Sequence, residues 1–74
     1  MAQEWLFSEH FQWEGKCYLV HVYRHAQRNK RCSHMAETAL APDDRIISDG
    51  TSPEDVLHKH QLILPLAIMS RALL

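Results

Sequence analysis

The sequence predicts an α+β domain: an antiparallel sheet of three to four strands, with one C-terminal helix packed on one of its faces. Three observations predict it. Apolar residues alternate with a period of two over the first third of the chain. Polar reversals then separate further strand-like segments, and a well-marked helix start follows near residue 52. Because the strands precede the helix instead of alternating with it, the 74 residues form a single domain of the α+β class.

The first two expected strands, at about 3–13 and 16–24, form a hairpin. Glu14 and Gly15 lie between them as a two-residue loop, which resembles the common Asp-Gly turn. Gly15 suits this position because a tight hairpin loop needs a positive φ, which glycine adopts without steric cost. The loop fixes the strand pairing, since opposed residue numbers must then add to 29.

This register divides the hairpin side chains between two faces. The opposed pairs on the aromatic face are Phe11 with Tyr18, Phe7 with Val22, and Trp5 with Arg24. The opposite face carries Leu6, His10, Cys17, Leu19, His21 and Tyr23. We expect the aromatic face to meet the helix.

A third strand is predicted over about 31–40, and a short fourth strand or extended link over 45–48. The register of the third strand is open by one residue, which decides the side chains that face the core. The alternatives are Cys32, Ala36 and Leu40, or Met35 and Ala39. We favour the first set.

The helix is expected over about 53–72. Ser52 can accept a hydrogen bond from an amide of the first turn, and Pro53 suits the first helical position because it lacks an N–H that would be unpaired there. Two acids follow directly and favour the positive end of the helix dipole. Pro65 removes one helical hydrogen bond, so we expect a bend or an interruption there.

One helix covers only one face of such a sheet, and its second half is apolar nearly all round. Apolar surface left in water on either element favours self-association. The candidate residues are Leu6, Leu19 and Tyr23 on the sheet, and Leu62, Leu66 and Met69 on the helix. We therefore expect a homodimer. The alternative is a monomer whose curved sheet wraps the helix more completely.

The charges form two blocks. No acid occurs between Gly15 and Ala36, whereas the stretch from Glu37 to Asp55 is mostly acidic, and the net charge is only −1. The predicted tip between the second and third strands is a candidate site for nucleic acid or an acidic partner, made by Arg24, His25, Arg28, Lys30 and Arg31. The alternatives are a solvated loop without a partner, or two blocks that neutralise each other.

No pattern in the sequence indicates an enzyme, a metal or another cofactor. Cys-x-x-Cys, His-x-x-x-His, glycine-rich phosphate loops and Gly-x-Ser-x-Gly are all missing from the sequence. One histidine group could form, from His10, His21 and His34, if the third strand takes the less favoured register. We expect a non-enzymatic binding module, with protein interaction favoured and RNA or DNA binding as the alternative.

The sequence predicts a cytoplasmic location. The first residues carry neither a basic segment nor a long apolar one, so no secretory signal is expected. The longest apolar stretch, 62–69, contains Pro65 and falls well short of the roughly 20 residues that span a membrane.

Overall fold

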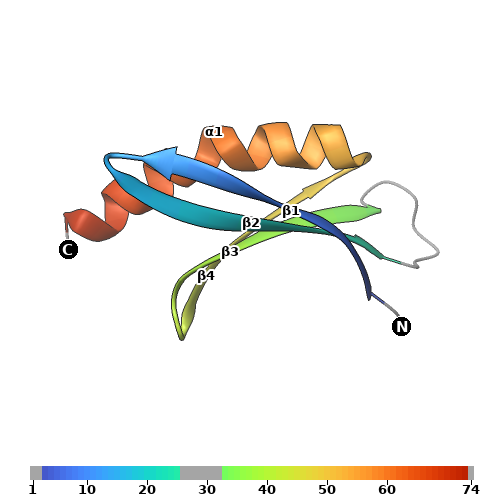
Figure 1. The fold of residues 1–74 in the computed structure, drawn as a ribbon, viewed down its shortest axis with the longest axis horizontal. Coiled ribbons are helices and arrows are strands. Elements are labelled where there is room, and N and C mark those ends of the chain that lie inside the picture. The colour runs from blue at the N-terminus through green and yellow to red at the C-terminus, as the bar shows by residue number, and fades with distance from the viewer. Residues whose placement is uncertain (1–2, 26–32, 74) are drawn as a thin grey trace.

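The computed structural model describes residues 3–25 and 33–73 (Figure 1). One antiparallel sheet with the strand order β1-β2-β3-β4 is followed by one helix, which confirms the predicted α+β fold. The elements are β1 Gln3–Trp13, β2 Lys16–His25, β3 His34–Ala41, β4 Asp44–Gly50 and α1 Pro53–Ala72. The fourth strand is therefore a full member of the sheet and longer than the segment 45–48 expected for it.

The β1–β2 loop has the conformation that its sequence predicts. Glu14 and Gly15 both have positive φ angles, 52° and 78°. Two successive left-handed residues let the loop follow the twist of the flanking strands, as in two-residue hairpins. The pairing numbers add to 29 from Phe7 to Trp13, so the predicted register holds over this part of β1.

On the N-terminal side of Phe7 the pairing shifts by one residue, because a β-bulge lies between Trp5 and Phe7. Trp5 pairs with Tyr23, and the expected pairing with Arg24 is wrong. Since neighbouring residues in a strand point to opposite faces, one extra residue exchanges the faces of the side chains beyond it. Leu6 consequently packs against the core, which corrects its expected place on the uncovered face.

The register of β3 is the favoured one. Ala36 is fully buried between Val22 of β2 and Ser48 of β4, and Leu40 packs against the same core. Met35 lies opposite Tyr23 on the other face. Cys32, the remaining residue of the favoured set, lies outside the described residues.

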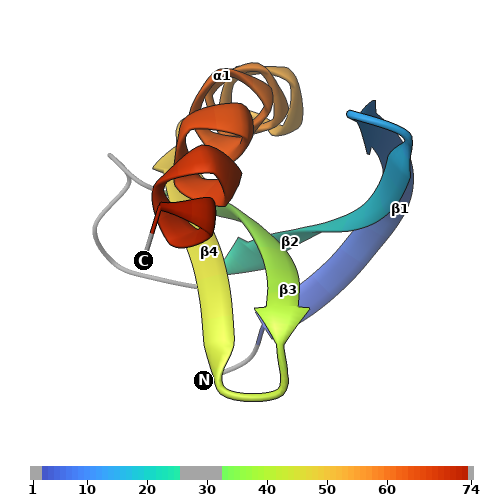
Figure 2. The same cartoon turned by 90° about the vertical axis from the view of Figure 1, so that its left-hand side faces the viewer.

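The core lies between the sheet and the helix. Figure 2 shows α1 over β3 and β4, while the β1–β2 hairpin curves up on the helix side of the sheet. The buried apolar residues are Val20, Val22, Ala36, Ile46, Val56 and Leu64. One face of the sheet is thus covered, and the other, here called the open face, has no element packed on it in the part of the chain that the structure describes.

The helix begins as predicted. Ser52 is its N-cap, in an extended conformation, and its Oγ accepts a hydrogen bond from the Asp55 amide at 3.0 Å. The helix runs through Pro65 to Ala72 as one element and bends in its C-terminal half (Figure 1). Proline thus causes no interruption here, although it lacks the N–H that would complete the ladder. Within the described residues, no helix has the length and apolar character that crossing a membrane requires.

Candidate functional site

His60 joins the helix to the covered face of the sheet. Its Nε2 lies 2.8 Å from Thr38 Oγ1 of β3, and its Nδ1 lies 2.9 Å from Ser48 Oγ of β4. All three side chains are buried, and burial lowers the pKa of His60 because it penalises the charged form. No pocket opens in the described part of the chain. The two contacts of the imidazole tie the helix to β3 and β4.

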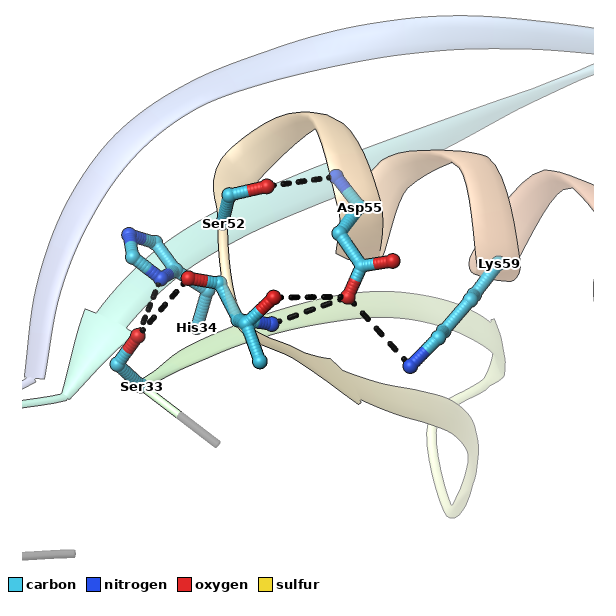
Figure 3. A network of polar contacts seen from close by, with 6 residues as sticks. Ser33, His34, Ser52, Asp55 and Lys59 are labelled. Atoms are coloured by element: carbon cyan, nitrogen blue, oxygen red, sulfur yellow. Dashed lines mark hydrogen bonds and ion pairs between the residues drawn. The ribbon is translucent and has the colours of Figure 1, made fainter. Parts of the chain in front are cut away.

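The start of the helix is held by a second polar network (Figure 3). Asp55 Oδ2 accepts hydrogen bonds from the Thr51 amide at 3.0 Å and the Thr51 hydroxyl at 3.4 Å, and it lies 3.4 Å from Lys59 Nζ. The Thr51 amide, with a smaller effect from Lys59, lowers the pKa of Asp55. Ser33 Oγ donates to the Thr51 carbonyl at 3.3 Å, which ties this turn to the chain just before β3. Asp55 therefore stabilises the start of the helix.

The outer surface of the helix is the most apolar exposed feature of the structure. Leu62, Leu66 and Met69 of α1 and Leu73, its C-cap in αR conformation, are 62%, 66%, 50% and 87% exposed. At about 100° per residue, their spacing of four, three and four places them within about 60° of the helix circumference. We call these four residues the outer seam; Ile63, also exposed, flanks it.

Toward the N-terminus the same stripe becomes polar. The residues three, four and seven positions before Leu62 share its side of the helix. They are Lys59, His58 and Asp55. Lys59 and His58 are exposed, and Lys59 is paired with Asp55 on its own helix. The apolar surface is thus confined to the C-terminal half of α1.

The open face of the sheet carries aromatic side chains, and some of its polar atoms form hydrogen bonds with one another. Trp5 is 58% exposed, and its Nε1 donates to Ser8 Oγ at 3.0 Å. Ser8 Oγ lies 2.6 Å from His21 Nδ1, and the rings of His21 and Tyr23 pack at a tilt with centroids 6.4 Å apart. Of the residues expected on this face, Leu19 is exposed and Tyr23 is half-buried.

Ion pairs occupy most of the bases that the structure describes. Of five Lys and Arg side chains in these ranges, four pair with acids. The pairs are Arg24 with Glu4, Arg45 with Glu37, Lys59 with Asp55, and Arg71 with Asp44. The last is bidentate, with Arg71 Nε and a terminal nitrogen 2.8 and 3.0 Å from the two Asp44 oxygens, and it lowers the pKa of Asp44.

The structure describes only part of the expected basic site. Arg24 projects from the same face as Val22 and is ion-paired with Glu4. The His25 amide donates to the Ser33 carbonyl at 2.8 Å, which closes the end of the sheet. The other three expected residues, Arg28, Lys30 and Arg31, lie outside the described residues.

The expected histidine group is not assembled. His34 pairs with Arg24 and therefore lies on the helix side of the sheet, whereas His10 and His21 lie on the open face. His34 Nδ1 instead lies 2.8 Å from Ser33 Oγ (Figure 3). Over residues 3–25 and 33–73, no three His, Cys, Asp or Glu side chains come together in a way that could hold a metal ion.

No protein family, curated protein or solved structure matches this chain. Its structure defines it as a β-β-β-β-α domain. The helix carries apolar side chains both on the side packed against the sheet and on the exposed side. Sequence reasoning overlooked Leu73, although the spacing from Leu62 onward would have identified it. It also placed Trp5 on the wrong face, because no residue in β1 marks the bulge.

Proposed function

We propose that the protein is a non-enzymatic interaction module that self-associates into a symmetric homodimer through the outer seam of its helix. The observation that carries this proposal is the contiguous exposure of Leu62, Leu66, Met69 and Leu73. Isolated exposed leucines are common on protein surfaces, but a continuous apolar stripe marks an interaction site. A second copy of this chain is the partner, because the seam can bury itself against an identical seam without leaving a polar group unpaired.

The size of the seam supports a reversible dimer. Its exposed fractions correspond to between two and three complete side chains per protomer. Full burial of one such side chain contributes roughly 1.5–3 kcal/mol, so two seams contribute roughly 8–16 kcal/mol. Association itself costs about 4–15 kcal/mol. Because the gain and the cost are similar, we expect a dimer whose population depends on protein concentration.

Replacing Leu66 and Met69 together by lysine tests the proposal. The variant should sediment as a single 8.6 kDa chain at concentrations at which the wild-type protein has about twice that mass. His58→Lys is the matched control on the polar part of the same stripe, and Leu19→Lys is the control on the open face. Both should remain dimeric. A wild-type protein that stays at 8.6 kDa over the whole accessible concentration range would refute the proposal.

Nucleic-acid binding through the basic segment stays a prediction, and so does the cytoplasm as compartment. Arg24 would first have to leave Glu4 before its guanidinium could meet a phosphate. Contacts with phosphates weaken steeply between about 50 and 200 mM salt, whereas an apolar interface responds little. A titration with single-stranded RNA at both salt concentrations therefore separates the two functions.

A further inference from the structure

We infer that the two helices of the dimer pair antiparallel, in the register in which facing residue numbers add to 135. Leu62 then meets the partner's Leu73, and Leu66 meets the partner's Met69. Along the helix, the two-fold axis then lies at the level midway between residues 67 and 68. This inference rests on the proposed function, since it specifies the geometry of the same dimer.

The spacing of the seam favours this register. The intervals of four, three and four residues read the same in both directions. An antiparallel copy rotated about the centre of the seam therefore places apolar side chains opposite apolar side chains along its whole length. Alternating intervals of three and four residues are typical of helices that cross at a shallow angle with knobs-into-holes packing.

A parallel pair is disfavoured by charge. In register, it would bring Asp55 against the partner's Asp55 and Lys59 against the partner's Lys59, and it would align the two helix dipoles. In the antiparallel pair the dipoles oppose each other. The polar half of each helix then extends beyond the interface and keeps its hydration.

Antiparallel pairing over the full helix length is disfavoured by burial. Overlap of residues 53–72 with themselves requires facing numbers that add to 125, which sets Lys59 against the partner's Leu66. Covering Lys59 in this way would desolvate an ammonium group without giving it a new partner. In the 135 register, exposed Ile63 lies on the same flank of the interface as the partner's Ser70, whose hydroxyl stays at the solvent edge, and Lys59 stays outside the contact.

This register gives the dimer a layered form, with two helices at the centre and a sheet outside each. The open face of each sheet, which carries Trp5, then points away from the interface. The dimer would present two copies of this aromatic surface on opposite sides.

Cysteine cross-linking tests the register. In a background with Cys17→Ser and Cys32→Ser, protein carrying Leu62→Cys is mixed with protein carrying Leu73→Cys and oxidised. The mixed 62–73 disulfide should form, whereas two Leu62→Cys chains should not join. Their positions lie about 16 Å apart along the helix axis in this register, beyond the roughly 7 Å that a disulfide allows between Cα atoms.

The outcomes separate the two proposals. A 62–62 disulfide with a dimeric wild type would overturn the register and leave the dimer standing, whereas monomeric wild-type protein in sedimentation would overturn both. A second measurement avoids disulfides: Leu66→Glu and Met69→Lys chains should pair with each other at least about tenfold more tightly than with themselves. Equal affinity of the mixed and the unmixed chains would overturn the 135 register, because it sets position 66 against the partner's position 69.

Discussion

His60 makes the stability of this fold depend on pH. The imidazole is buried between Thr38 and Ser48, and burial lowers its pKa from the ordinary value of 6.5. Both neighbours are hydroxyls, which can donate or accept, so protonation costs desolvation and not a lost hydrogen bond. The unfolded chain binds this proton more readily than the folded one. The contribution of His60 is therefore complete above pH 6.5 and is lost as the pH falls from 6.5 toward the lower pKa of the folded state.

The magnitude follows from proton linkage. In that pH window one proton taken up on unfolding lowers the free energy of unfolding by about 1.4 kcal/mol per pH unit. A chain of this length has a total stability of roughly 4–11 kcal/mol. Acidification below pH 6.5 therefore lowers the free energy of unfolding, with this slope as its upper limit.

The assay is urea denaturation at a fixed protein concentration, repeated from about pH 8 down to about pH 5. His60→Gln is the informative variant, because an amide can accept from one hydroxyl, donate to the other, and does not titrate. Its stability should be lower at pH 8 but should change less with acidification than that of the wild type. His58→Gln, two residues away and exposed, is the matched control. Parallel pH curves for wild type and His60→Gln would show that His60 does not carry the effect.

Variants at three further positions test local structure through the denaturation midpoint. Gly50→Ala should destabilise by about 1–3 kcal/mol, because the new Cβ would lie 2.8 Å from both Asp55 Oδ2 and Val56 Cβ; an unchanged midpoint would contradict this close approach. Ser52→Ala should cost about 1 kcal/mol and Ser52→Asp much less, whereas equal losses would exclude a capping role. Glu14→Asn should stabilise by up to about 1 kcal/mol, since asparagine tolerates the φ of 52° better, and a lower midpoint would argue against this turn.

The parts of the fold that the sequence predicts well are those set by neighbouring residues. A glycine in a two-residue loop fixes the first hairpin, and Ser52 followed by Pro53 marks the start of the helix. The register of β3 was also predictable, because Ala36 and Leu40 are the apolar members of one alternating set. In each case the decisive contact spans a few residues or one strand.

The missed features depend on contacts between distant segments. The bulge in β1 adds one residue without a glycine or proline to mark it, and this single step exchanges the faces of Trp5 and Leu6. The bonds of His60 to Thr38 and Ser48 follow from the register of two strands together with the rotation of the helix. Neither the register of the strands nor the rotation of the helix follows from local propensity. The missed seam residue Leu73 differs from these, since the helical spacing alone would have included it.

The choice between the two exposed surfaces follows from their polar groups. On the open face the Trp5 N–H is bonded to Ser8, and Arg45 lies 2.6 Å from a carboxylate oxygen of Glu37. Covering this face would desolvate these groups, which offsets part of the gain from burying apolar area. The outer seam carries no polar side chain between Leu62 and Leu73 along its line of contact. Burial of apolar area is opposed less there than on the open face, which is why the proposed dimer uses the helix. The open face is suited to a partner that can keep some of its water.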